Sequence, residues 1–214
     1  KSQLVIDSNG QLFVDQAEIM APANIEYAGT ICTSTEASGI CLGNDSKATA
    51  VNTAAYGQNA SATAQGAVAV GAYSNASQQF AIAMGANATA SNDTSLAVGR
   101  AAEASGDNTV SLGAYSVASG STSQAIGRDA KASGINSIAH GYSSLASGGS
   151  SIAIGKQSCS TNSQAIAIGV TAKGSGASSI AIGQCAQATQ LNAIASGHSA
   201  RATASGAIAV GVDS

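Results

Sequence analysis

The sequence predicts an all-β fold, a parallel β-roll in which a unit of fourteen residues repeats along the chain. Glycine recurs at a constant spacing of fourteen, thirteen times from Gly43 to Gly211. The residue three before this glycine is Ile, Val or Leu in eleven units, and the residue two before it is Ala in eleven. Self-similarity at one fixed period is the sequence signature of a solenoid. We therefore expect a solenoid of stacked coils, not a globular core.

The composition agrees with small repeated coils and excludes several other classes of protein. Aromatic residues make up 3% and charged residues 9% of the chain, whereas an ordinary soluble domain has roughly 25% charged residues. The net charge of −3 gives no reason to expect a nucleic-acid partner. No apolar run approaches the roughly 20 residues of a membrane-spanning helix. The chain lacks an initiating Met, and we expect it to be a mature or excised fragment.

The first 38 residues do not fit the repeat and are expected to form a hairpin and cap. Two apolar runs, residues 4–7 and 11–14, flank Asn9-Gly10, and Asn-Gly between apolar runs is a strong hairpin signal. A solenoid end needs a cap over its exposed coil, and contact with a ligand at the rod tip is the alternative role. The predicted domains are a cap segment at 1–38 and a roll of about 12–13 coils at 39–214.

Each unit of the roll is expected to contain two short strands and two turns. Alternating β-branched residues, as in 151–154, favour a strand and lie on one of its faces. The recurring glycine turns the chain where a Cβ would be penalised. A second strand with small residues at alternate positions follows, as at Ala130 and Ala132. A Ser-Gly or Ser-Asn region then turns the chain back.

Stacking places like residues above like residues, about 4.8 Å apart. In so narrow a coil we expect the Ile/Val column to form one interior wall and an Ala/Ser column the other. The Ala two before each glycine should then point outward, giving a flat face that a single solenoid rarely exposes without a partner. We therefore expect lateral self-association through this face, which comprises Ala69, Ala83, Ala97, Ala153, Ala167 and Ala181.

Several repeats resemble those of a known family. Ser-Leu-Ala-Val-Gly at 95–99 and Ser-Ile-Ala-Ile-Gly at 151–155 and 179–183, each followed by small-x-Ala-Ser/Thr, are similar to the head repeats of trimeric autotransporter adhesins. The YadA-like head is the type, and the resemblance covers residues 39–214. It implies a left-handed parallel β-roll assembled as a homotrimer on the outer surface of a Gram-negative bacterium. It also implies a stalk and an outer-membrane anchor.

Three polar residues interrupt the apolar columns, namely Gln124, His140 and Ser196. We expect His140, which replaces an inward aliphatic residue, to be satisfied in the core or in a subunit interface. A catalytic base would need a nucleophile or a carboxylate partner, and the sequence supplies neither for this histidine.

The four cysteines are expected to behave as two separate pairs. Cys32 and Cys41 are nine residues apart near the cap, where a disulfide is plausible in an oxidising surface environment. Cys159 and Cys185 are two coils apart, about 10 Å along the stack and beyond disulfide reach. We expect both to be unpaired within a chain. Without a Cys-x-x-Cys motif or His spacing suited to a ligand set, no zinc site is expected.

Seven of the eight Lys and Arg residues lie one or four residues after a repeat glycine, and we expect them to line an outer edge as a spaced file. Solubility is one explanation. An adhesive surface is the other, because repeated weak contacts gain from multivalency and Tyr is favoured in contact patches. The candidate adhesion residues are Arg100, Arg128, Lys156, Lys131, Lys173, Tyr73, Tyr115 and Tyr142.

The function expected from the sequence is that of a non-enzymatic adhesin head, without catalytic residues, cofactor or metal. Heads similar to it adhere to extracellular matrix proteins, host cells or abiotic surfaces. Membrane contact is expected only through a C-terminal anchor absent from this chain. A phage or viral fibre segment with the same roll is the alternative, which free cysteines favour because fibres assemble in a reducing cytoplasm. An acyltransferase of the hexapeptide type is not expected, because fourteen is not a multiple of six.

Overall fold

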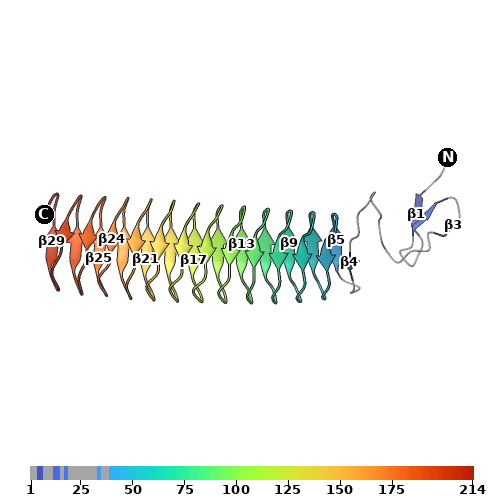
Figure 1. Ribbon diagram of the computed structural model, residues 1–214, viewed down its shortest axis with the longest axis horizontal. Coiled ribbons are helices and arrows are strands. Elements are labelled where there is room, and N and C mark those ends of the chain that lie inside the picture. The colour runs from blue at the N-terminus through green and yellow to red at the C-terminus, as the bar shows by residue number, and fades with distance from the viewer. Residues whose placement is uncertain (1–3, 7–11, 15–16, 19–32, 35–38) are drawn as a thin grey trace.

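From residue 39 onward the chain forms a long rod of stacked coils (Figure 1). The computed structural model describes residues 4–6, 12–14, 17–18, 33–34 and 39–214. Within these residues every regular element is a β-strand. The strands form one three-stranded sheet and two parallel sheets of 13 strands each. The expected all-β parallel solenoid is confirmed.

The N-terminal strands form a small antiparallel sheet. β1 (Leu4–Ile6) pairs with β2 (Leu12–Val14), with Leu4 opposite Val14. β3 (Ala17–Glu18) pairs with the other side of β2. The expected Asn-Gly turn and most of the expected cap lie outside the described residues. The domain boundary and the capping role stay predictions.

Strands of three residues alternate along the chain with strands of two, and each kind forms its own parallel sheet. The three-residue sheet contains β5 (Ile40–Leu42), β7 (Ala54–Tyr56), β9 (Val68–Val70), β11 (Ile82–Met84), β13 (Leu96–Val98), β15 (Val110–Leu112), β17 (Gln124–Ile126), β19 (Ile138–His140), β21 (Ile152–Ile154), β23 (Ile166–Ile168), β25 (Ile180–Ile182), β27 (Ile194–Ser196) and β29 (Ile208–Val210). The two-residue sheet contains β4 (Thr33–Ser34), β6 (Lys47–Ala48), β8 (Ser61–Ala62), β10 (Asn75–Ala76), β12 (Thr89–Ala90), β14 (Glu103–Ala104), β16 (Val117–Ala118), β18 (Lys131–Ala132), β20 (Leu145–Ala146), β22 (Cys159–Ser160), β24 (Lys173–Gly174), β26 (Gln187–Ala188) and β28 (Arg201–Ala202).

Successive coils pair in parallel with a constant register of fourteen residues. Ile152 lies beside Ile166, and Ala153 lies beside Ala167. Backbone hydrogen bonds join the coils, as where Ile152 N donates to Ala165 O at 2.9 Å. Every column of the sequence repeat is therefore a continuous ladder along the rod.

Each coil closes through two turns, and the recurring glycine begins the first of them. These glycines have φ between 120° and 140°, a region that residues other than glycine rarely adopt. A Cβ on Gly113 would also lie 2.6 Å from the carbonyl carbon of Gly127 in the next coil. Two residues after each glycine the chain is left-handed, as at Tyr115 (φ 60°). The amide of Tyr115 donates to Arg100 O at 2.9 Å, a coil-to-coil bond that offsets part of the strain.

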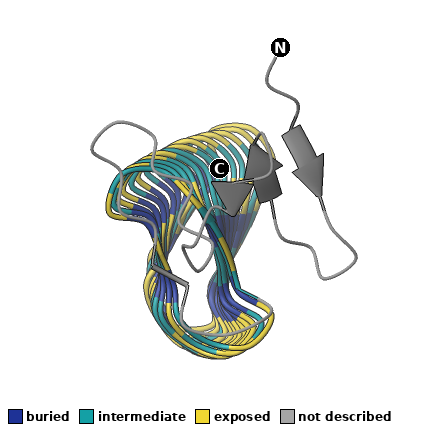
Figure 2. Cartoon of the chain, turned by 90° about the vertical axis from the view of Figure 1, so that its right-hand side faces the viewer, coloured by how far each residue is buried: buried dark blue, intermediate teal, exposed yellow. Residues whose placement is uncertain are grey.

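The interior of the coil contains only small side chains. Every fully buried hydrophobic side chain in the described part of the chain is an alanine, and the largest fully buried side chains are Thr53 and Thr109. Many of the buried hydroxyls donate to turn carbonyls, as where Thr109 Oγ1 donates to Gly106 O at 2.7 Å, whereas those of Ser137 and Ser151 have no hydrogen-bond partner. Figure 2 shows the buried residues on the two walls that face each other across the narrow middle of the coil. The Ala-rich composition follows from this narrow interior.

The expected strand orientation is wrong. The residues expected to form an outer contact face are completely buried within the single chain, namely Ala69, Ala83, Ala97, Ala153, Ala167 and Ala181. Because side chains alternate across a strand, the Ile and Val residues on either side of each alanine point outward. Alternation places the alanines on one side of the strand and the Ile and Val residues on the other, and the interior of the narrow coil has room only for the alanines.

Candidate functional site

The outward face of the three-residue sheet carries two columns of large aliphatic residues. Parallel register aligns them, so Ile154 lies beside Ile168 and Ile168 beside Ile182. They remain accessible in the single chain, and Ile154 is 39% exposed. We name this surface the apolar face, and it comprises Val68, Val70, Ile82, Met84, Leu96, Val98, Val110, Leu112, Ile126, Ile138, Ile152, Ile154, Ile166, Ile168, Ile180, Ile182 and Ile194.

His140 interrupts the apolar face at its centre. It lies between Ile126 and Ile154 in the parallel ladder, and Nε2 is buried without a hydrogen-bond partner. The expectation that His140 points inward is wrong, because it shares the outward column of its neighbours. Gln124 is exposed one coil away, beside Val110 and Ile138. The apolar face therefore has one polar patch in its middle third.

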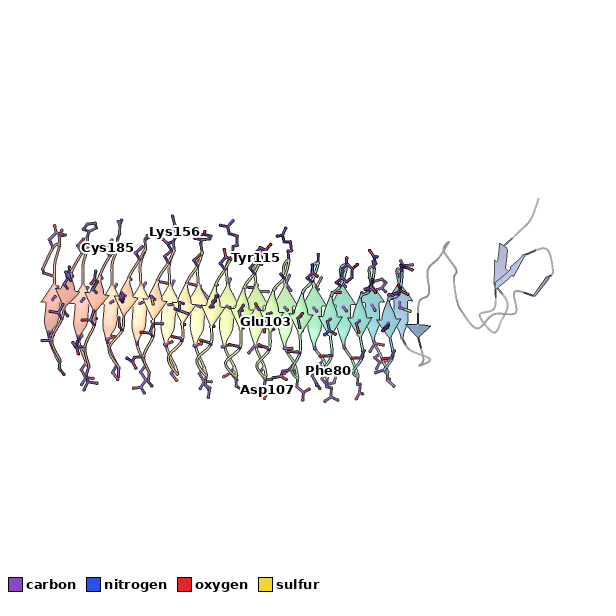
Figure 3. The ribbon with its side chains drawn as sticks, in the orientation of Figure 1. Phe80, Glu103, Asp107, Tyr115, Lys156 and Cys185 are labelled. Atoms are coloured by element: carbon purple, nitrogen blue, oxygen red, sulfur yellow. The ribbon has the colours of Figure 1, made fainter. Side chains whose placement is uncertain are left out.

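A second surface follows the edge formed by the first turn of each coil. Arg100, Tyr115, Arg128, Tyr142 and Lys156 come from five successive coils, and all five are exposed. We name this set the cationic edge. The guanidinium carbon of Arg100 lies 4.9 Å from the ring centroid of Tyr115, and that of Arg128 lies 4.6 Å from the centroid of Tyr142. Figure 3 shows Tyr115 and Lys156 projecting from the same side of the rod.

Arg128 connects two neighbours at the centre of the cationic edge. Its Nη2 donates to the hydroxyl of Tyr142 at 2.8 Å, and its Nε lies 3.2 Å from Asp129 Oδ2. The hydrogen bond from Arg128 lowers the pKa of Tyr142 and raises the pKa of Arg128. Asp129 neutralises part of the positive charge at this point. The edge is thus a linked file of cations and phenol rings with one acid among them.

The remaining adhesion candidates divide between two places. Tyr73 lies in the same type of turn as Tyr115, with φ 59°, and its side chain is exposed. Lys131 and Lys173 lie instead on strands β18 and β24 of the two-residue sheet, and both are exposed. The expectation of a single basic file is therefore wrong, because the cations form one file on the turn edge and another on the sheet.

The opposite edge of the rod has a different character. Asp93 and Asp107 occupy its turns in adjacent coils, and its turn residues in the described coils include no Lys or Arg. Side-chain ladders connect successive coils there, as where Gln79 Nε2 donates to Gln65 Oε1 at 3.1 Å and Thr94 donates to Asn108. Figure 3 shows Phe80 and Asp107 on this side, away from Tyr115 and Lys156. The two edges therefore differ in charge.

The repeats match a protein-family model, the YadA head domain repeat (2 copies). The matched segments are residues 62–88, 90–116, 118–144, 132–158, 160–184 and 188–214, which together span most of the chain. The chain belongs to the YadA head family. Among curated proteins, the comparison finds no match. Membership of this family indicates an adhesin-type function and an extracellular, surface-exposed location.

The cysteines of this YadA head are in different states. Cys159 and Cys185 are free, which confirms that they are unpaired within the chain. Burial raises the pKa of Cys159, an effect that nearby Lys173 partly opposes. Cys41 is disulfide-bonded. Cys32 lies outside the described residues, so the pairing of Cys32 with Cys41 stays a prediction.

Neither a metal site nor a membrane helix is found in the described part of this YadA head. There, His, Cys, Asp and Glu side chains nowhere gather in a group of three or more that could hold a metal ion. Nor do the described residues form any helix with the length and hydropathy needed to span a membrane.

Sequence reasoning named the turn cations and tyrosines but missed their pairing and the apolar face. A signal for the pairing was present, because residues fourteen or fifteen apart at a turn fall in adjacent coils. Arg128 and Tyr142 are separated by fourteen, and Arg100 and Tyr115 by fifteen. The apolar face was missed because the inward direction was assigned to the larger aliphatic set.

Proposed function

We propose that this YadA head is the adhesive part of a non-enzymatic cell-surface protein, a left-handed β-roll that works as a homotrimer. The observation that carries the proposal is the apolar face, which runs along most of a chain whose repeats match the YadA head. Three rods packed through it would form one rigid fibre. The fibre would present the turn edges and the two-residue sheets of three chains to a target.

The apolar face supports self-association more strongly than the alanine columns could. Soluble monomers rarely expose a continuous apolar patch of more than a few hundred Å². Here, aliphatic columns extend from β9 to β27 and are half-buried to exposed in the single chain. Closed symmetric assemblies are the common way for identical chains to cover such a surface. The contact face we propose is therefore the Ile/Val face, in place of the Ala residues expected from the sequence.

Trimerisation would also make weak adhesion effective. Each exposed ion pair or ring contact contributes little alone, about 0–1 kcal/mol. A rod repeats such contacts along its length, and a trimer triples them, which can raise avidity about 10²–10⁴-fold. Extracellular matrix proteins, host cells and abiotic surfaces are the proposed targets. A C-terminal outer-membrane anchor is the proposed means of attachment to the cell.

A fibre segment of a phage or virus is the second candidate function. The free Cys159 and Cys185 favour it, because free thiols persist in a reducing cytoplasm. The disulfide at Cys41 favours the oxidising exterior of a cell. The disulfide and the family match together make the adhesin the preferred proposal.

Light scattering tests the assembly first. The chain has a mass of 20.5 kDa, so a trimer should have about three times that mass, with and without reductant. Ile154→Lys with Ile168→Lys, on the apolar face, should give a monomer because the charges cannot be buried without partners. The matched control is Val117→Lys with Leu145→Lys, on the outward side of the two-residue sheet, and it should leave the trimer intact. A wild-type monomer would contradict the assembly.

Adhesion is tested with beads that carry the wild-type head or the Ile154→Lys/Ile168→Lys variant. Wild-type beads should bind at least one target class, namely immobilised matrix protein, cultured host cells or bare glass. The monomeric variant should bind at least about tenfold less, because multivalency is lost. Failure of wild-type beads on all three classes, together with binding to bacterial cells, would replace the adhesin with the phage-fibre candidate.

A further inference from the structure

We propose that the cationic edge binds a linear sulfated polysaccharide whose chain lies along the rod. The inference deepens the proposed adhesive function by naming a ligand class, and it rests on that function. It concerns Arg100, Tyr115, Arg128, Tyr142 and Lys156, which are all exposed on five successive coils. A chain that spans from Arg100 to Lys156 would cross four coil steps, roughly 19 Å.

The cations of this edge have a regular spacing. Arg100, Arg128 and Lys156 each lie one residue after a repeat glycine, and each is two coils from the next. Two coil steps correspond to about 10 Å. The file is continuous because every coil pairs with the next in the same register. Anionic groups that recur at regular intervals along an extended polymer can therefore meet successive cations.

The tyrosines fix the direction in which the arginines act. The guanidinium of Arg100 lies over the Tyr115 ring, and that of Arg128 lies over the Tyr142 ring and bonds its hydroxyl. A stacked guanidinium keeps its N–H groups at its rim, where they can donate to an oxyanion, often in pairs. The rings also supply rigid, partly apolar surface beside each cation. A sulfated sugar offers oxyanions and apolar C–H faces in the same alternation.

The shape of the edge favours a thin extended polymer. It is a convex line of turns, so it offers little of the roughly 800 Å² per partner that a stable protein–protein contact buries. Single-stranded nucleic acid would need open aromatic faces on which bases stack, but a guanidinium already lies over Tyr115 and over Tyr142. A polysaccharide needs only one row of contacts along its length.

The charge distribution limits the polymer to this part of the surface. The opposite edge carries Asp93 and Asp107 and has no Lys or Arg in the turns of its described coils. Glu103 interrupts the second file of cations on the two-residue sheet and is exposed there. On the cationic edge the only acid of these five coils is Asp129, which is paired with Arg128 at 3.2 Å. A polyanion therefore meets least repulsion along the cationic edge.

The experiment measures binding of the intact head to immobilised heparin by surface plasmon resonance, with hyaluronan as the unsulfated polymer. Heparin should bind and hyaluronan should bind much more weakly, and raised salt should weaken the complex. Arg100→Gln, Arg128→Gln and Lys156→Gln together should reduce heparin affinity about tenfold or more. The matched control replaces Lys47, Lys173 and Arg201 of the two-residue sheet by Gln. It makes the same change in net charge and should alter affinity by less than about twofold.

A variant that is expected to strengthen binding makes the test independent of stability, because a folding defect would only weaken binding. Asp129→Asn releases Arg128 from its ion pair and removes the acid, so it should strengthen heparin binding. Equal losses in the two triple variants, or equal binding of hyaluronan, would overturn the inference. So would tighter binding of poly-U RNA than of heparin through the same residues. If heparin fails to bind while the beads still adhere to matrix, cells or glass, the ligand class is wrong and the adhesive function stands.

Discussion

At the scale of single residues, each repeat glycine meets two separate constraints. Its φ lies in a region that favours glycine, and from Gly43 to Gly197 its Cα faces the backbone of the next coil so closely that no Cβ can be accommodated. The next coil cannot move away without breaking the parallel ladder on both sheets. A glycine column without slips is therefore the part of the repeat that the coil geometry requires most strictly, which is why it was readable from the sequence.

Gly113→Ala should destabilise the rod. The new Cβ would lie 2.6 Å from the carbonyl carbon of Gly127, and φ is 138°, so we expect a loss of about 1–3 kcal/mol or more in the free energy of unfolding. Urea denaturation followed by circular dichroism measures it. Gly149→Ala is the control and should be nearly neutral, because nothing lies within 4 Å of the position that its Cβ would take. Equal stability of the two variants would contradict this account of the glycine column.

At the scale of elements, the alternation of large and small side chains predicted the three-residue strand, but it did not predict which set of side chains faces the interior of the coil. The sequence separates Ile152 and Ile154 from Ala153, and both assignments satisfy the period of two. The choice depends on the distance between the two sheets, which is set by the length of the coil. The candidate site was likewise predictable only in part, because its residues could be named from the sequence but their contacts could not. Turn positions identified Arg100 and Arg128, whereas the contacts with Tyr115 and Tyr142 depend on the coil-to-coil register.

His140→Ile should strengthen the proposed trimer. His140 is half-buried in the single chain, and burial of the apolar face against other chains would move the rest of its polar ring from water into an apolar contact, at a cost of about 1–3 kcal/mol for each chain. Isoleucine continues the column formed by Ile126 and Ile154. The concentration at which the trimer dissociates, measured by sedimentation, should fall. Gln187→Ile on the two-residue sheet is the matched control and should leave that concentration unchanged. A weaker trimer in His140→Ile would show that the histidine has a partner there.

At the scale of the whole molecule, the rod is one-dimensional, because each coil pairs only with its neighbours in the sheet order. Stability in such a chain is close to a sum over coils and their contacts.

The coil also has an internal half-period of seven. Left-handed residues stand two and nine after the repeat glycine, as at Tyr115 and Thr122. Buried columns are likewise seven apart, as at Ser116 and Ser123. The halves differ in what they present outward, since one sheet bears the apolar face and the other bears mostly polar residues.

Two deletions separate the coil from its half-coil. Removal of residues 169–182 takes out one full period and joins Ile168 to Gly183, so every column continues in register. This variant should remain trimeric by light scattering, with a modest fall in the urea midpoint. Removal of residues 169–175 takes out seven and joins Ile168 to Gly176. Small residues would still face inward, but Ile180 would take the place of Lys173 on the two-residue sheet, and Ile182 would follow directly after that strand. The apolar face would then change sides part-way along the rod, and the trimer should be lost. A stable trimer from the half-coil deletion would mean that the apolar face does not hold the chains together.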